Sequence, residues 1–283
     1  MPELPEVETV RRVLSFKIIN KKIRDVKILK QKLFQGNPKE IIGSKIVAID
    51  RRAKVLFIKL SNGKFLMVHL KMSGQLVWVS KAGERVSLGH PIPFSDNNLP
   101  GKTTHIIFSI DGGKLFYNDL RQFGWIKLVD QKTVKKEWKK FGPEPFSKEF
   151  SKDYLKKIFS RSKKAIKLFL LDQNKIAGLG NIYANEALFE AGINPLKPTN
   201  SLEEKEIDKL RRAIIKILKE GIKYKGSSAA DEAYIQPTGE KGAYQEHFRV
   251  YQKQGQKCQK CNTLIKKVKI GGRGTFYCPK CQH

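Results

Sequence analysis

The sequence predicts an α+β multidomain chain: an N-terminal β-sandwich with flanking helices, a helical C-terminal domain and a terminal zinc-finger β-hairpin with four cysteine ligands. Three observations predict this class. Strand-like apolar runs fill the first part of the chain, helical periodicity follows, and two Cys-x-x-Cys pairs lie near the end. We expect these boundaries: a sandwich over 1–132, a linker over 133–150, a helical domain over 151–250 and a zinc finger over 251–283.

The expected strands of the first domain come mainly from two hairpin signals. Residues 54–60 and 64–70 flank a Ser-Asn-Gly turn, and residues 104–110 and 114–117 flank an Asp-Gly-Gly turn. Further strands are expected over 44–50, 75–79 and 124–129. Several of these runs are apolar on both faces, which indicates strands covered on both sides. Residues 80–102 show no helical or strand periodicity of apolar residues and are expected to form a loop.

The second half of the chain changes to a helical period after a Lys-rich run and Gly-Pro-Glu-Pro at 142–145. Helices are expected near 153–160, 163–173 and 182–191. A capping box of Ser201 and Glu204 predicts the start of a longer helix. Residues 226–257 have little period and are expected to be loops.

The four cysteines of the chain form two pairs, Cys258 with Cys261 and Cys278 with Cys281. This ligand count and spacing is typical of one tetrahedral structural zinc ion. The segment between the pairs predicts a hairpin that reverses at glycines 271, 272 and 274, with Arg273 at its tip. Two disulfides are the alternative that the pattern leaves open.

The N-terminus is a second candidate site. Val7, Val10 and Leu14 mark one face of a helix that begins near Pro5. A small residue after Met1 normally permits removal of Met1, which would expose a secondary amine at Pro2. Such an amine can attack a sugar C1′ or an aldehyde and form an iminium, with Glu3 beside it to transfer protons. An ordinary acidic helix start is the alternative.

The balance of charge is strongly basic, with a formal net charge of +29. A polyanionic partner suits such a chain because neutralising phosphates releases counterions and drives binding. A merely solvated basic surface is the alternative. No apolar run of the sequence approaches the length of a membrane span, so we expect a cytoplasmic protein that acts at the nucleoid, without a membrane partner.

Six ordered motifs give the chain a recognisable pattern. They are RRAK at 51–54, HLKMSG at 69–74, DLRQFG at 119–124, FGPEP at 141–145, LGNIYANEALFEAGINP at 179–195 and GGRGTFYCPKCQ at 271–282. With the opening PELPEVET and the cysteine pairs, the chain resembles the formamidopyrimidine-DNA glycosylases, bacterial base-excision repair enzymes for oxidised purines. The resemblance covers essentially the whole chain. It implies a helix–two-turn–helix motif in the helical domain.

This resemblance implies the activity and the catalytic residues. Pro2 would attack C1′ of the damaged nucleotide, and β- and δ-eliminations would cut the strand on both sides of the lesion. Glu3 would transfer protons to the sugar, and Lys54 would hold phosphates and assist catalysis. Arg273 would act with them from the hairpin tip.

The resemblance also implies the residues that contact DNA. Met72, Arg121 and Phe123 would fill the space left by an extruded nucleotide. Phosphates would contact Asn181 and Arg273. The remaining expected contacts are Glu6, His105 and Lys163. The expected partner is double-stranded DNA that contains oxidised bases or abasic sites, bound by a monomer with one structural zinc ion.

Two segments depart from the family pattern. Residues 226–234 lie where many members carry a loop over 8-oxoguanine, and after Ser227 and Ser228 the sequence differs. Residues 119–122 read Asp-Leu-Arg-Gln where Asp-Pro-Arg-Arg is more usual. The ranking of lesions is therefore open. Three other functions are alternatives: an endonuclease VIII-like enzyme for oxidised pyrimidines, a catalytically silent damaged-DNA-binding protein and a ribosome-associated zinc ribbon.

Overall fold

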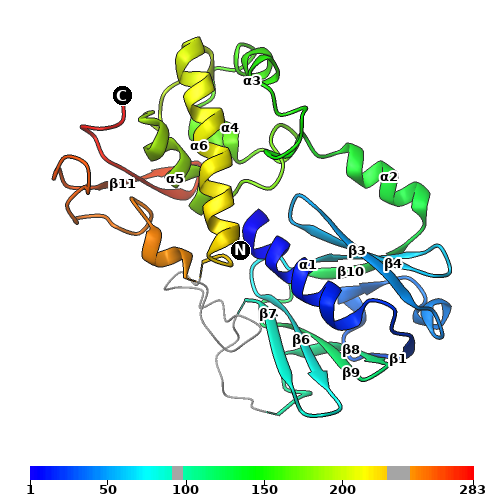
Figure 1. The fold of residues 1–283 in the computed structure, drawn as a ribbon. Coiled ribbons are helices and arrows are strands. Elements are labelled where there is room, and N and C mark those ends of the chain that lie inside the picture. Colours follow the sequence, from blue (N-terminus) through cyan, green and yellow to red (C-terminus); the bar gives the residue numbers. More distant parts are fainter. Residues whose placement is uncertain (91–97, 228–242) are drawn as a thin grey trace. The chain divides into compact units, whose positions relative to one another are not determined.

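A computed structural model describes residues 1–90, 98–227 and 243–283. The chain divides into two compact units (Figure 1). The first comprises Met1–Lys139 with Tyr224–Gln245, and the second comprises Lys140–Lys223 with Glu246–His283. Of the expected capping segment 226–234, only residues 226 and 227 lie within the described part. The division into four domains expected from the sequence stays a prediction.

The first unit contains two five-stranded sheets with the orders β1-β8-β9-β6-β7 and β2-β10-β5-β4-β3. Their strands are β1 (Ile23–Ile28), β2 (Phe34–Gln35), β3 (Ile46–Arg52), β4 (Val55–Leu60), β5 (Phe65–His69), β6 (Gly74–Ser80), β7 (Arg85–Gly89), β8 (Thr104–Ile110), β9 (Gly113–Asp119) and β10 (Trp125–Val129). Short 3-10 helices span Gln31–Leu33 and Pro38–Ile41. All strand pairs are antiparallel except β2 with β10.

The core of this unit is apolar because alternate residues of both sheets point inward. Leu76 and Trp78 of β6 face the same core as Leu56 and Ile58 of β4. The intervening Val77 belongs to a separate apolar cluster, as the period of two requires. In the second sheet, Phe57 lies between Leu56 and Ile58, is also buried and is not part of that core. Strands of both sheets thus carry apolar residues on both faces, as the sequence predicts.

Helix α1 (Leu4–Ile18) packs against β3 and β4 of one sheet and against β7 of the other. Because β3 and β7 are edge strands, α1 covers one open side of the sandwich. Val7, Val10 and Leu14 are almost wholly buried in the core, on the helix face that the sequence predicts. The burial of each is worth about 1.5–3 kcal/mol.

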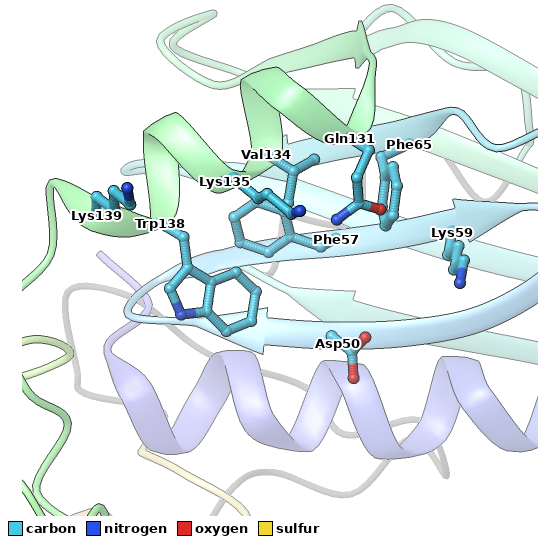
Figure 2. Close-up of a pocket in the computed structure, with 9 residues that line it drawn as sticks. All are labelled: Asp50, Phe57, Lys59, Phe65, Gln131, Val134, Lys135, Trp138 and Lys139. Carbon is cyan, nitrogen blue, oxygen red and sulfur yellow. The ribbon is translucent and has the colours of Figure 1, made fainter.

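Helix α2 (Gln131–Lys139) lies on the outer face of the second sheet (Figure 2). Val134 is buried, and the Trp138 ring lies 5.2 Å from the Phe57 ring of β4. The Lys-rich run that precedes residue 142 therefore forms an ordered helix, which belongs to the first unit.

The second unit is helical and ends in a β-hairpin. Its helices are α3 (Lys152–Phe159), α4 (Ile166–Leu170), α5 (Asn181–Ala191) and α6 (Glu204–Lys223), and the hairpin strands are β11 (Lys266–Ile270) and β12 (Arg273–Tyr277). Short 3-10 helices span Thr199–Ser201 and Tyr244–His247, of which the latter begins in the first unit. Helix α5 packs against α4, α6 and β12, so it is the centre of this unit. No described helix is long and apolar enough to cross a membrane.

Most expected elements are confirmed, and three details are wrong. Residues 85–89 form strand β7 within the expected loop 80–102. The helix expected over 163–173 is limited to α4. The start of α6 is fixed by Glu206, whose Oε2 accepts the Glu203 N–H at 2.8 Å, whereas the Ser201 hydroxyl donates to the Pro198 carbonyl. The capping box is therefore displaced by two residues, because the chain makes a 3-10 turn over 199–201 first.

The Glu8 carboxylate predicts how the stability of the first unit depends on pH. Burial alone would raise its pKa, but hydrogen bonds from Arg11 and Arg12 and the charge of Arg51 lower the pKa to about 2. The folded protein then binds fewer protons than the unfolded chain between about pH 4.5 and 2. We expect Glu8→Gln to cost about 2 kcal/mol at pH 7, and we expect that difference to vanish as the pH falls through this window.

Urea unfolding at about pH 7, 4 and 3 measures this dependence. Glu84→Gln, which removes an exposed carboxylate that pairs with Lys17, is the matched control and should change stability by less than about 1 kcal/mol. An equal effect of Glu8→Gln at every pH would contradict the assignment.

Candidate active site and nucleic-acid interface

The start of α1 holds the candidate nucleophile and its neighbour in a buried position. Pro2 is buried and Glu3 is only 3 % exposed. The Glu3 backbone N–H donates to Glu6 Oε2 at 2.8 Å, which is one half of a capping box at the helix N-terminus. The peptide group that joins Pro2 to Glu3 is therefore fixed by the first turn of the helix.

The second oxygen of Glu6 reaches a segment that is remote in sequence. Glu6 Oε1 accepts the backbone N–H of Ser227 at 2.9 Å. Gly226 lies beside it with φ +86°, and a Cβ there would approach Glu6 Cγ to 2.8 Å. Only glycine fits this approach. The Glu6 carboxylate thus links the helix start to the residue that precedes 228–242.

Lys54 lies in the turn between β3 and β4 and is 6 % exposed. Ala53 adopts φ +54°, and its carbonyl accepts a hydrogen bond from Arg51 Nη1 at 3.0 Å. This turn aims Lys54 inward, close enough to His69 that the charge of Lys54 contributes to lowering the pKa of His69. Lys54 is therefore a buried residue and not the solvated start of a strand.

His69, at the end of β5, is a candidate site residue that the sequence reasoning missed. Burial, with the charges of Lys71 and Lys54, lowers its pKa to about 3, so the ring is neutral at pH 7. Its Nδ1 accepts the Lys71 backbone N–H at 3.0 Å, which leaves the proton on Nε2. A neutral N–H donor beside Lys54 suits a phosphate oxygen. The motif HLKMSG contains this signal, although the resemblance assigns a role only to its Met.

The expected wedge residues lie on two loops that are joined at one corner of the sandwich. The chain crosses between the sheets from β5 to β6 and again from β9 to β10. The pairs Gly74↔Asp119 and Trp125↔His69 bring the ends of both crossings together. Met72 lies in the first crossing, and Arg121 and Phe123 lie in the second.

Asp119 connects these two loops. Its buried carboxylate accepts the Ser73 hydroxyl at 2.5 Å and the Gly124 N–H at 2.7 Å. The Ser73 hydroxyl oxygen accepts the Arg121 N–H at 2.8 Å. One carboxylate therefore holds both loop conformations in place.

The tip of the second loop is exposed although two of its side chains are large and apolar. Phe123 is 55 % exposed and Leu120 is 54 % exposed. The Arg121 guanidinium lies 4.8 Å from the centre of the Phe123 ring, and Met72 is partly exposed. Exposed aromatic and apolar side chains on a fixed loop suit insertion into stacked bases better than core packing.

His105, another expected contact, lies inside the sheet. It is 5 % exposed, and its Nε2 lies 2.9 Å from the Asp119 carbonyl oxygen. Its carbonyl accepts the N–H groups of Leu29 and Lys30. This geometry gives His105 a part in fixing the end of β9, and its contact with DNA stays a prediction.

The second unit contains the other expected DNA contacts. Asn181 is the first residue of α5, after Gly180. Its side-chain Nδ2 donates to the Gly274 carbonyl of the hairpin at 3.1 Å. Its backbone carbonyl accepts from Lys167 Nζ at 3.0 Å and from Asn185 Nδ2 at 2.7 Å. The wholly buried Lys167 thus fixes the helix N-terminus.

The hairpin tip lies beside this helix N-terminus. Gly271 and Gly272 adopt φ +55° and +76°, so the turn needs glycine, and a Cβ on Gly271 would come within 2.5 Å of Leu168. Arg273 follows the turn and is exposed. Lys163 is also exposed, just before α4. Asn181 and the hairpin are therefore brought together, and Arg273 is directed to solvent.

The four cysteines fit a zinc ion. Their sulfurs all lie within 4.8 Å of one another, with 3.4 Å between those of Cys261 and Cys278 and 3.9 Å between those of Cys258 and Cys281. A tetrahedral ion with sulfurs at about 2.3 Å separates them by about 3.8 Å. The site is thus a single four-thiolate metal centre, and the disulfide alternative is not supported, since all four are free.

This centre is joined to α5 by buried contacts. Cys258 and Cys278 pack with Phe189 and Phe276 in one apolar cluster. The wholly buried Glu186 accepts the backbone N–H groups of residues 249, 250 and 251 at 2.8, 3.0 and 2.9 Å. The metal therefore supports a hairpin whose base is part of the helical core.

Three family models match the chain. They are described as the formamidopyrimidine-DNA glycosylase N-terminal domain over residues 1–126, the formamidopyrimidine-DNA glycosylase H2TH domain over 141–233, and a zinc finger found in FPG and IleRS over 255–283. The last match assigns the four-thiolate centre as one structural zinc site.

Curated relatives and solved structures match over the whole chain. The formamidopyrimidine-DNA glycosylases of Pelotomaculum thermopropionicum and Carboxydothermus hydrogenoformans are 42 % and 40 % identical, and each alignment covers 99–100 % of both chains. The Lactococcus lactis Fpg in complex with an abasic-site DNA superposes with a TM-score of 0.88 at 36 % identity, covering 99 % of both chains. A MutM structure with DNA containing carbocyclic 8-oxo-G gives 0.87 at 36 % identity over 100 % of both chains.

The sandwich, the helix–two-turn–helix unit and the zinc hairpin define a bifunctional DNA glycosylase and AP lyase of base-excision repair. The chain belongs to the formamidopyrimidine-DNA glycosylase family.

The hydrogen bonds of the Asp119 carboxylate lead to the first testable prediction about the site. We expect Asp119→Ala to lower the free energy of unfolding by about 2–4 kcal/mol, because the Ser73 hydroxyl and the Gly124 N–H lose a buried charged acceptor. We also expect it to impair unstacking, read as a smaller fluorescence rise of 2-aminopurine beside an abasic analogue. Asp111→Ala, on an exposed hairpin of the same unit, is the control. Normal unstacking by a folded Asp119→Ala would show that the loops do not depend on it.

Removal of zinc gives the second test. We expect Cys278→Ser, or treatment with a strong chelator, to release one zinc ion per chain and to weaken binding to abasic-analogue DNA at least about tenfold, since the hairpin loses its support. Lys280→Ala changes the same turn without removing a ligand and should keep the metal. Metal release is measured with a chromogenic chelator and binding by fluorescence anisotropy. Unchanged affinity in the zinc-free protein would separate the hairpin from DNA binding.

Proposed function

We propose that this enzyme excises oxidised purines, formamidopyrimidines and 8-oxoguanine, from duplex DNA and then cuts the strand, with Pro2 as nucleophile. The observation that most supports this proposal is the buried start of α1. There the capping contact of Glu6 holds Pro2 and Glu3 at the helix N-terminus. An ordinary acidic helix start needs neither residue buried.

The proposed chemistry follows from a secondary amine. After removal of Met1, the Pro2 nitrogen attacks C1′ of the damaged nucleotide, and the electron pair of the glycosidic bond leaves with the base. The base takes up a proton as the Pro2 nitrogen loses one. Glu3 donates a proton to the sugar ring oxygen, and the ring opens to an iminium between Pro2 and C1′. The iminium withdraws electrons, which acidifies the C2′ proton, and loss of this proton expels the 3′ phosphate. Loss of the C4′ proton then expels the 5′ phosphate. Water then releases the sugar fragment from Pro2.

The remaining residues of the first unit position the substrate in this proposal. Lys54 and the neutral His69 donate to phosphates around the lesion. Met72 and Phe123 insert into the stack after the nucleotide is extruded, and Arg121 faces the base left without a partner. Glu6 is a positioning residue that fixes the peptide group after Pro2.

The second unit supplies a phosphate site in this proposal. Asn181 and the backbone N–H groups at the start of α5 bind a phosphate oxygen, which the positive end of the helix dipole favours. Arg273 at the hairpin tip binds the same strand, and Lys163 adds a further positive charge. The contact between Asn181 and the Gly274 carbonyl supports this grouping.

The proposed substrates agree with the ligands of solved relatives. Lactococcus lactis Fpg is known in complexes with abasic-site DNA and, as mutants, with DNA containing Fapy-dG. We propose that this chain acts on duplex DNA as a monomer at the bacterial nucleoid. The altered sequence after Ser227 leaves the ranking between 8-oxoguanine and formamidopyrimidines to experiment.

Borohydride trapping tests the proposal. Protein shown by mass spectrometry to lack Met1 is incubated with duplexes that carry 8-oxoguanine opposite cytosine, a formamidopyrimidine or an abasic site. We expect a covalent adduct at Pro2 with all three. Glu3→Gln should slow excision by about 10²–10⁴-fold, since proton transfer is lost. Glu84→Gln is the control.

Three outcomes separate the alternatives. An adduct with the abasic duplex alone rejects oxidised purines as substrates and directs the test to oxidised pyrimidines. No adduct with any duplex, from protein that binds them, indicates a catalytically silent binder. An adduct at Lys54 in place of Pro2 would overturn the assigned nucleophile.

A further inference from the structure

A pocket of about 480 Å³ lies between helix α2 and the outer face of the second sheet in the first unit (Figure 2). Phe57 and Phe65 of the sheet form its apolar floor, and Val134 and Trp138 line it from α2. Pockets that bind small ligands have about 300–1,000 Å³, so this one has room for a large side chain. None of its lining residues is among the candidate catalytic or DNA-contacting residues, so the pocket is separate from the site described above.

The floor of the pocket is well formed. Phe57 and Phe65 are 1 % and 6 % exposed, and the sheet fixes both side chains because they lie on neighbouring strands. Trp138 is 37 % exposed and tilts over Phe57 at 46°. More than a third of a tryptophan therefore remains uncovered beside a rigid aromatic floor. An apolar group placed there would remove this surface from water.

The rim of the pocket is positive. Lys59, Lys135 and Lys139 line it together with a single carboxylate, that of Asp50. Figure 2 shows Lys135 above the floor, with Lys59 and Lys139 at opposite ends. Across the described residues, no ion pair or side-chain hydrogen bond involves these three lysines, whereas other lysines of this unit, such as Lys17, pair with glutamate. The rim thus carries an excess of positive charge around an apolar centre.

We propose that this pocket binds an acidic peptide segment of a partner protein that inserts one large apolar side chain. The apolar side chain would fill the space between Phe57, Val134 and Trp138, and flanking carboxylates would pair with the three lysines. Duplex DNA fits less well, because its bases are stacked and its exposed backbone offers no apolar anchor. A second copy of this chain is disfavoured, since two chains that each carry +29 repel.

Fluorescence anisotropy with the full-length, zinc-loaded protein tests the proposal. The probe is a fluorescein-labelled peptide of four aspartates followed by leucine and phenylalanine. We expect saturable binding that weakens as salt rises, because the rim charges are exposed. A probe with asparagine in place of aspartate, and one with serine in place of the final phenylalanine, should each bind at least about tenfold more weakly.

Charge-reversal variants locate the site. Lys135→Glu should weaken binding of the acidic probe at least about tenfold, whereas Lys136→Glu, the same change on the next residue of α2 and outside the pocket, should change it less than about twofold. Trp138→Ala should weaken binding as well. The two lysine variants alter exposed side chains, so we expect both to fold. They therefore still test the proposal if Trp138→Ala does not fold. Base excision should be unchanged in both lysine variants.

Three results would overturn the proposal. One is equal binding of the probe by the Lys135→Glu and Lys136→Glu proteins. Another is equal binding of the acidic and the asparagine probes. The third is displacement of the probe by a single-stranded oligonucleotide together with loss of oligonucleotide binding in Lys135→Glu, which would assign the pocket to nucleic acid.

Discussion

The closure of the sandwich by α1 is the constraint on which the first unit depends. Both sheets end on this side in an edge strand, β3 in one and β7 in the other, and one amphipathic helix covers the two edges. The apolar face of α1 can be buried in only one orientation, with Val10 and Leu14 toward the core. That orientation fixes the first turn of the helix, and therefore the position of Pro2. Core packing thus places Pro2, the proposed nucleophile.

The charged contacts of α1 refine this placement. Glu8, on the buried side, pairs with Arg11 and Arg12 of its own helix and with Arg51 of β3. Arg51 also donates to the Ala53 carbonyl, one residue before Lys54. A chain of hydrogen bonds therefore runs from α1, which begins two residues after Pro2, to the turn that carries Lys54. Two candidate site residues that are remote from each other in the sequence share one support.

The sequence predicts well those helices and strands whose pattern is contained in a short stretch of the chain. The hairpins around residues 61–63 and 111–113 and the four-cysteine hairpin are confirmed because each turn is specified by its own glycines. The expected start of α6 is wrong because both Ser201 and Glu203 offer caps, and only the path of the preceding chain selects one. Strand β7 is not predicted because Arg85–Gly89 is short and has no strand pattern of its own. It forms a strand by pairing with β6.

The candidate site divides in the same way. Pro2 and the four cysteines carry their chemistry in residue type and spacing, so the sequence alone indicates them. The roles of Asp119 and Lys167 come from contacts across 46 and 14 positions, which no local pattern contains. His69 is an intermediate case: it lies in a recognised motif, but its neutral state depends on burial beside Lys54. The resemblance indicates His105 as a DNA contact. In the structure, its ring lies inside the sheet and contacts the Asp119 carbonyl.

In the functions proposed above, positive charge has different roles at different places on the surface. Among the proposed phosphate-binding residues, Lys54 is 6 % exposed and follows a turn with a fixed backbone, so its charge is oriented before any ligand arrives. Around the apolar pocket at α2, the bordering lysines have Asp50 as the single carboxylate of the lining. A polyanion held only by its backbone would gain from the charges and leave Trp138 uncovered. An acidic segment with an apolar anchor satisfies both features at once. For this reason the aromatic floor, more than the charge, distinguishes the pocket from the proposed DNA-contacting residues.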